Sequence, residues 1–189
     1  MADSNSPQVD FIFECGALAR IGRTGWTRIA PNFWQSIADH THRATAIGSL
    51  LAHQLSADVS RVITMLTFHD FHECRIGDLD RVQKRNIAAD ESQVIGRQTK
   101  ELSSFGELIL RHWEEFHHGK EIEAQIARDA DLLEIAVTAR ELEIMGNASA
   151  TMFKEGVAGK FETDAAAQLY EEIRSSSPHQ WWRNITKSK

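Results

Sequence analysis

The sequence predicts an all-α fold in a single compact domain. Three prolines in 189 residues and a lack of alternating β-branched runs leave little sign of strands, whereas apolar residues recur at helical spacing from about Phe11 to Arg174. The length suits one domain, and 42% hydrophobic residues suffice for a sizeable core. We therefore expect one helical domain over 11–183, with flexible, largely polar ends at 1–10 and 184–189.

Charge and cysteine content exclude several classes of protein. Lysine and arginine number 21 against 27 aspartates and glutamates, so the net charge of −6 disfavours a broad nucleic-acid-binding face. Cys15 and Cys74 are too few for a disulfide framework, and no apolar run follows positive charges near the N-terminus. No segment reaches the roughly 20 consecutive apolar residues of a membrane helix. We expect a cytoplasmic protein that binds neither membrane nor nucleic acid.

The first strongly patterned helix is predicted over 36–55, where apolar residues recur on one face and His40 lies among them. That face consists of Ile37, Ala44, Ile47, Leu51 and Leu55. A second helix is predicted from Asp58, a good N-cap residue, to about Cys74. Its apolar stripe continues at the same spacing into His69, Asp70 and Glu73. The apolar stripe of this helix is thus predicted to end in three ionisable residues.

The later elements follow from composition and turn signals. Gly77 and the polar run 80–92 predict a loop or lid, and His117-His118 is expected in another loop. The segment 121–145 is apolar nearly all round its middle, which predicts a central helix packed on several sides, with Asp131 inside it. The last helix is expected over 165–173.

Two carboxylates on apolar helix faces need a compensating partner. Burying Asp70 or Asp131 alone costs several kcal/mol, and a divalent metal satisfies both. Together with His40 and His69 they form a nitrogen and oxygen donor set that suits Mn, Co, Fe, Ni or Zn. A lone histidine on an apolar face is more often a core residue, so the evidence lies in the order of the four residues along the chain.

Residues 17–145 resemble the HD-domain phosphohydrolase superfamily, specifically its compact branch of bacterial 5′-deoxynucleotidases and small eukaryotic and archaeal HD-domain proteins. The stretches that carry the resemblance are R-T-G-W (23–26), Q-S-I-A-D-H-T-H-R (35–43), F-H-D-F-H-E-C-R-I-G-D (68–78) and A-R-D-A-D-L-L-E (127–134).

The resemblance implies that the metal ligands are His40, His69, Asp70 and Asp131. Asp129 is the competing choice for the last ligand. On a helix Asp129 is turned about 160° from Asp131, away from the apolar face expected to pack inward, so the helical phase favours Asp131.

Further site residues follow from the same resemblance. It implies an acid/base role for Glu73 and an assisting role for Asp78, although a solvated helix end and a turn after Gly77 are the alternative explanations. Arg23 offers a fork for a phosphate and Trp26 a flat face for a base or sugar. The bacterial nucleotidases have this arginine and tryptophan adjacent, whereas here Thr24 and Gly25 separate them.

The leading hypothesis is metal-dependent hydrolysis of a 5′-(deoxy)nucleoside monophosphate to nucleoside and phosphate. The alternative enzyme is a dNTP triphosphohydrolase or another phosphoesterase of the same fold. The alternative without catalysis is a metal- or nucleotide-binding module, which would have a closed coordination shell beside Glu73. A triphosphate needs additional cations, for which the presumed loop offers Arg75, Arg81, Lys84 and Arg85. The Trp181-Trp182 pair is a candidate interface of a homodimer.

Overall fold

The computed structural model describes residues 5–187, and the predicted all-α fold is confirmed in this range. Its only β contact there is an isolated bridge between Gly22 and Ser36. The helices are α1 (Pro7–Cys15), η1 (Gly16–Arg20), α2 (Thr24–Thr27), α3 (Ile37–Gln54), α4 (Val59–Phe68), α5 (Glu73–Ile76), α6 (Arg81–Lys84), α7 (Glu91–Thr99), α8 (Ser103–His118), α9 (Ile122–Ile144), η2 (Ala148–Ala150), α10 (Thr151–Val157), α11 (Asp164–Ser175) and α12 (Gln180–Lys187).

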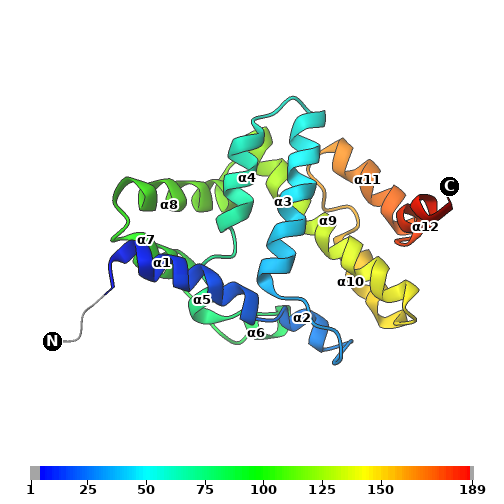
Figure 1. The fold of residues 1–189 in the computed structure, drawn as a ribbon, viewed down its shortest axis with the longest axis horizontal. Coiled ribbons are helices and arrows are strands. Elements are labelled where there is room, and N and C mark those ends of the chain that lie inside the picture. The colour runs from blue at the N-terminus through cyan, green and yellow to red at the C-terminus, as the bar shows by residue number, and fades with distance from the viewer. Residues whose placement is uncertain (1–4, 188–189) are drawn as a thin grey trace.

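Helix α9 is the centre of the molecule, as its nearly uniform apolar pattern predicts. It packs against α3, α4, α8, α10 and α11 (Figure 1). Leu133 and Ala136 on α9 are fully buried, and they join one core with Leu51 of α3 and Leu66 of α4. Apolar contacts on several sides explain why this helix has no polar face over its middle turns.

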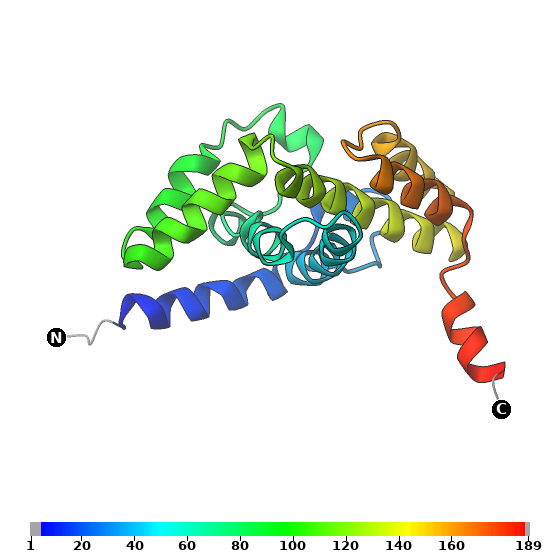
Figure 2. The same cartoon turned by 90° about the horizontal axis from the view of Figure 1, so that it is seen from above.

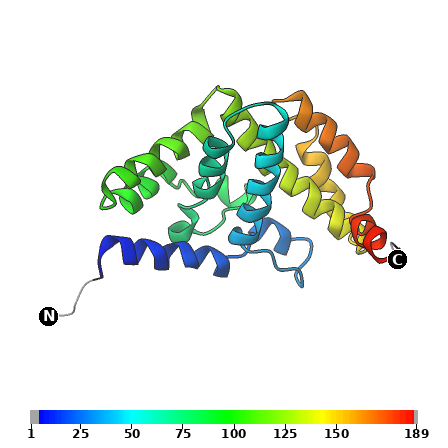
Figure 3. The ribbon, with the colours of Figure 1, turned by 45° about the horizontal axis from the view of Figure 1, so that its top comes forward.

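Helices α3 and α4 form a pair that brings two histidines together. Ser36 begins α3 with a reciprocal capping box to Asp39, and Asp58 caps α4 through the Arg61 amide, as expected for these residues. The connection 55–58 is short, and the two helices pack side by side (Figures 1 and 3). The first turn of α3 therefore lies next to the last turn of α4.

The close approach of α3 and α4 depends on Gly48. A Cβ atom at this position would lie 3.0 Å from Val62 Cγ1 and closer still to Leu66 Cδ1. We expect Gly48→Val to destabilise the protein by about 1–3 kcal/mol, because both neighbours are fully buried and cannot yield without cost. Thermal unfolding measures the change. Gly96→Val is the control, since a Cβ on Gly96 of α7 meets nothing within 4 Å, and an equal loss in both variants would contradict the packing argument.

The second predicted helix was expected to continue to about Cys74, which is wrong. Helix α4 ends at Phe68, and successive tight turns lead through 69–72 into α5. Burial explains the break: His69 and the three consecutive residues Phe71, His72 and Glu73 are all buried. One face of a regular helix cannot bury neighbouring residues in this way.

Two other expectations also need correction. The predicted loop over 80–92 contains the short helix α6, which Asp80 and Gln83 begin with a capping box. His117 and His118, expected in a loop, form the last turn of α8. In both cases the helix is set by caps and tertiary packing that the apolar pattern alone does not reveal.

The two ends of the described chain lie on opposite sides of the molecule (Figure 2). Helix α12 follows the expected last helix and was missed, because its large apolar residues stay exposed and leave no buried face as a signal. The predicted flexible ends 1–10 and 184–189 include 1–4 and 188–189, which lie outside the described residues, so the boundaries of the domain stay predictions. Among residues 5–187, no helix has the length and apolar character needed to cross a membrane.

Candidate metal centre and adjoining pocket

Three predicted ligands from distant parts of the chain meet at one point. His40 lies in the first half of α3, His69 is the C-cap of α4, and Asp131 lies in the middle of α9. The Nε2 atom of His40 is 3.3 Å from His69 Nε2 and 3.1 Å from Asp131 Oδ1. One donor atom from each residue lies within 4.8 Å of the other two, and both imidazoles are buried. The cluster is therefore compact enough to hold a single ion.

Asp70, the fourth predicted ligand, lies at the edge of this cluster. Its Oδ2 atom is 3.1 Å from His69 Nε2 and 3.6 Å from His40 Nε2. The same oxygen accepts a hydrogen bond from Arg23 Nη1 at 3.3 Å. Asp70 thus connects the candidate metal centre to the arginine predicted to contact a phosphate.

Hydrogen bonds on the far side of each imidazole orient its Nε2 atom toward the cluster. His69 Nδ1 donates to the carbonyl of Leu66 at 2.7 Å, and His40 Nδ1 donates to Glu134 Oε2 at 2.7 Å. In a neutral imidazole with Nδ1 protonated, the lone pair is on Nε2. Two such nitrogens with carboxylate oxygens fit the predicted Mn, Co, Fe, Ni or Zn ion.

The charges around the cluster favour a cation. Burial alone would raise the pKa of Asp70, but the nearby His69 and Arg23 hold that pKa well below its usual value. Burial has the same effect on Asp131, and the hydrogen bond from His40 lowers its pKa. Burial and Arg23 would lower the pKa of His40, yet hydrogen bonds to Asp131 and Glu134 raise it to about 9. A metal ion held by His40 Nε2 would displace that proton.

Asp129 occupies a different environment from Asp131. Its carboxylate is fully buried and accepts hydrogen bonds from the amides of Glu162 and Thr163 and from the Thr163 hydroxyl, at 2.7–2.9 Å. Asp129 therefore fixes the start of α11. The expectation that it lies away from an inward-packed face was wrong, because α9 is packed on that side as well, but the carboxylate does point away from His40 and His69.

Glu73, predicted as the acid/base residue, begins α5 and is almost fully buried, with 4% of its surface exposed. Its Oε2 atom has no hydrogen-bond partner among the described residues. Burial, together with the negative charges of Asp70 and Asp78, raises the pKa of Glu73 to about 10. An unpartnered carboxyl oxygen beside a charged cluster is free to interact with a bound molecule.

Asp78 holds the turn that carries Arg23. Gly77 ends α5 with a φ of 76°, which glycine adopts without strain, and the chain then returns toward α2. The carboxylate of Asp78 accepts hydrogen bonds from the amide and hydroxyl of Thr24 and lies 3.7 Å from Arg23 Nη1. Arg23 is thereby fixed between Asp70 and Asp78. The predicted assisting role of Asp78 stays a prediction.

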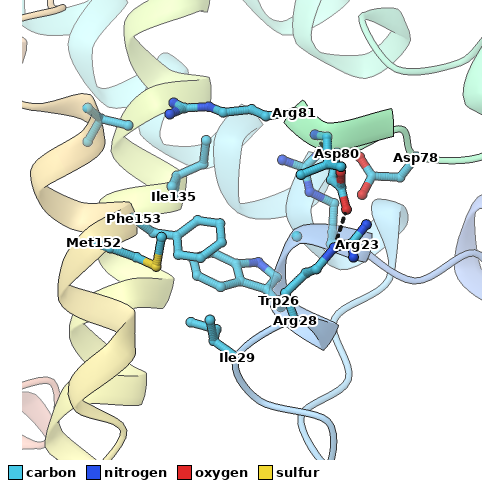
Figure 4. Close-up of a pocket in the computed structure, with 13 residues that line it drawn as sticks. Arg23, Trp26, Arg28, Ile29, Asp78, Asp80, Arg81, Ile135, Met152 and Phe153 are labelled. Carbon is cyan, nitrogen blue, oxygen red and sulfur yellow. Dashed lines mark hydrogen bonds and ion pairs between the residues drawn. The ribbon is translucent and has the colours of Figure 1, made fainter. Parts of the chain in front are cut away.

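A cavity of about 340 Å³ adjoins Arg23 and Asp78, and it has the size of a small-ligand pocket. Its walls are mainly apolar and come from α2, α9 and α10, and Arg81 of α6 and the N-cap residue Asp80 also line it (Figure 4). Trp26 lines this cavity, but only 3% of its surface is exposed because Phe153 covers it, with ring centroids 4.5 Å apart. Phe153 and Met152 therefore form much of the wall that Trp26 was predicted to supply.

The comparison with protein families decides the assignment. The model of a family described as HD domain matches residues 15–174. The chain belongs to the HD-domain family. This confirms the family predicted from the motifs in 17–145, and the HD-domain match extends into the last turn of α11.

Curated relatives of this HD-domain chain carry the name 5′-deoxynucleotidase HDDC2. The protein of Xenopus laevis is 28% identical over 178 residues, which cover 89% of this chain and 88% of the relative. The protein of Homo sapiens is 25% identical over 174 residues, covering 88% and 84% respectively. These names agree with the prediction of a hydrolase that acts on nucleotides.

Solved structures share the same HD-domain fold. A conserved hypothetical protein from Pyrococcus furiosus superposes with a TM-score of 0.74 at 27% identity, over 88% of this chain and 98% of that chain. A predicted metal-dependent phosphohydrolase from Magnetospirillum magnetotacticum gives a TM-score of 0.70 over 89% of this chain and 92% of that chain. At 18% identity, the second likeness supports the fold alone.

The sequence prediction assigned no role to several residues that support the HD-domain site. Glu134 and Gln35 lie within the motif stretches, yet only the structure shows that they contact His40 and Trp26. Glu134 follows Asp131 by three residues, so its helical phase could have signalled the shared face. His72 is buried and accepts a hydrogen bond from the Trp113 indole at 3.2 Å.

Proposed function

We propose that this protein hydrolyses 5′-(deoxy)nucleoside monophosphates to nucleoside and phosphate, using a divalent transition metal. One observation carries the proposal: His40, His69 and Asp131 converge beside Asp70 and Arg23, which borders a mainly apolar cavity. A metal centre that is linked through Asp70 and Arg23 to a cavity of this size suits cleavage of the bond between a phosphate and a nucleoside. The names of the curated relatives support the same substrate class.

The metal would be held by His40, His69, Asp70 and Asp131. When bound, a divalent ion supplies a Lewis acid that neutralises charge on the phosphate and lowers the pKa of water. The protein orients both imidazoles for this purpose through the hydrogen bonds at their Nδ1 atoms. Asp70 accepts a hydrogen bond from Arg23 and so joins the phosphate-binding arginine to the metal ligands.

The remaining residues bind the substrate and move a proton. Arg23 presents a planar fork to the phosphate, held in place by Asp70 and Asp78. Glu73, with its buried and unpartnered Oε2, would exchange a proton with water or with the departing 5′-oxygen. The nucleoside would lie against the wall that Phe153 forms over Trp26.

The arrangement of cations favours a monophosphate over a triphosphate. Of the four cations Arg75, Arg81, Lys84 and Arg85, Arg81 lines the cavity. Arg75 pairs with Glu14 at 2.6 Å, and Lys84 pairs with Glu91 at 3.4 Å. A triphosphate carries about four charges and usually recruits several basic groups. Beyond the metal and Arg23, the described cavity wall offers Arg81, and it offers Arg28, which is already paired with Asp80.

We expect dAMP to be converted to deoxyadenosine and phosphate in the presence of Mn²⁺ or Co²⁺, because one phosphate matches the charge of the metal and Arg23. Chromatography of the products from dAMP and from dATP tests this expectation. Release of tripolyphosphate from dATP with dAMP left intact would instead identify the alternative triphosphohydrolase. If the protein binds metal but hydrolyses neither nucleotide nor a simple phosphomonoester, the non-catalytic module would be favoured.

We also propose that the protein is cytoplasmic and that it forms a homodimer in which α12 takes part. Trp181, Trp182 and Ile185 are 58–66% exposed on this short helix, and such large apolar side chains are typical of interface centres. Sedimentation should show a dimer for the native chain and a monomer for a variant with Trp181→Ser and Trp182→Ser. A native chain that sediments as a monomer at micromolar concentration would contradict the dimer.

A further inference from the structure

A fully buried carboxylate lies behind the candidate metal centre. Glu134 has no exposed surface, and its Oε2 atom accepts the hydrogen bond from His40 Nδ1. Its Oε1 atom accepts from Arg43 Nη2 at 2.9 Å, from the Thr138 hydroxyl at 2.9 Å and from Gln35 Nε2 at 2.7 Å. A buried charge with this many donors is well compensated and fixed in place. Glu134 can therefore hold the His40 ring in one orientation.

Gln35 connects this carboxylate to the cavity. While its side-chain Nε2 donates to Glu134, its Oε1 accepts from the Trp26 indole Nε1 at 2.7 Å. Its backbone carbonyl also accepts from the amide of Arg23 at 2.9 Å. One residue thus contacts the wall of the cavity, the chain that carries the phosphate-binding arginine, and the partner of a metal ligand.

The amide of Gln35 fits this position in one orientation. If its oxygen and nitrogen were exchanged, the nitrogen would face the Trp26 N–H donor and the oxygen would face the Glu134 carboxylate. Each contact would then be a repulsive pair of like groups. Because Gln35 is only 6% exposed, water cannot readily replace the lost hydrogen bonds. Neither Met nor Glu at position 35 reproduces both contacts.

We propose that Glu134 and Gln35 are positioning residues, which hold the metal ligand His40 and the cavity residue Trp26 in one continuous hydrogen-bond network. The inference rests on the proposed function, since it assigns His40 to a metal. Glu134 would fix His40 with Nε2 directed at the ion. Gln35 would hold the side chains of Trp26 and Glu134 in fixed positions relative to each other, because it hydrogen-bonds both. A carboxylate in this position raises the basicity of its histidine and strengthens metal binding.

The test is the affinity of purified variants for Mn²⁺, measured from the electron paramagnetic resonance signal of the free ion. Glu134→Gln should lower that affinity about 10- to 100-fold, the typical effect of losing such a partner. Glu141→Gln is the matched control, because Glu141 also lies on α9 and pairs with Arg43 at 2.8 Å but forms no hydrogen bond or ion pair with His40 among the described residues. The control should bind Mn²⁺ as the native protein does. Should Glu134→Gln fail to fold, Glu134→Asp, which keeps the charge but shortens its reach, takes its place.

Gln35→Met tests the second half of the network. At saturating Mn²⁺, we expect KM for dAMP to rise about 10-fold because Trp26 loses its hydrogen-bond partner, with a smaller change in kcat. A purely structural role would lower the melting temperature of the Glu134 and Gln35 variants while leaving Mn²⁺ affinity and KM at native values, and that result would overturn the proposal. A native protein that binds no Mn²⁺ or related metal would overturn the proposed function itself.

Discussion

Replacing His69 or Asp131 by alanine is expected to remove the metal from the purified protein and to lower dAMP hydrolysis by roughly 10³-fold or more, as is usual when residues that act as one catalytic unit are lost. Each variant deletes one of the donor atoms that lie within 4.8 Å of one another. His40→Ala and Asp70→Ala should have the same direction of effect. Elemental analysis gives the metal content per chain, and the nucleotide assay gives the activity.

Asp129→Ala is the control for the ligand assignment. The native Asp129 accepts three hydrogen bonds from Glu162 and Thr163 at the start of α11. The variant should lose thermal stability, since buried donors lose their acceptor, but the folded fraction should keep its metal. If Asp129→Ala emptied the site and Asp131→Ala left it filled, the assignment of Asp131 as a ligand would be wrong.

Glu73→Gln should lower turnover of dAMP by about 10²-fold or more while metal content and melting temperature stay close to native values. Glutamine has the shape of the buried glutamic acid but cannot exchange a proton, and general acid/base help contributes about this much. Single-turnover kinetics at saturating metal separate the chemical step from product release.

The matched control for this variant is Glu91→Gln. Glu91 is a half-buried carboxylate near the same turn and pairs with Lys84 and, at 3.7 Å, with His72. Its replacement should leave turnover within a few-fold of the native value. Native turnover in a metal-loaded Glu73→Gln protein would remove Glu73 from the mechanism.

The parts of the fold that follow local rules could be predicted from the sequence. Ser36 and Asp58 begin α3 and α4 as N-caps, and the apolar middle of α9 gives the central helix. The order of two histidines and two aspartates along these helices predicted a cluster, and three of the four meet as one donor group. The caps and the apolar pattern depend on residues close together in the chain, whereas the cluster joins distant segments and was predicted from the resemblance to a family.

Features that depend on contacts between distant segments could not be predicted. Phe153 covers Trp26 only because α10 packs near α2, and nothing near Trp26 in the sequence reports that contact. Asp129 and Asp131 are two residues apart, yet Asp129 contacts Thr163 before α11 and Asp131 contacts His40 of α3. Helical phase distinguishes their directions, but it cannot tell which direction meets another helix.

The central position of α9 also determines when the metal site can form during protein synthesis. A ribosome releases α3 and α4 first, so His40 and His69 emerge well before Asp131 and Glu134. Until α9 follows, the apolar sides of the two earlier helices lack a partner that both of them contact, and the donor group is incomplete. Metal at about 100 times its Kd would then add about 2.7 kcal/mol to the stability of the finished chain alone. Metal binding would therefore indicate that the nascent chain has folded as far as α9.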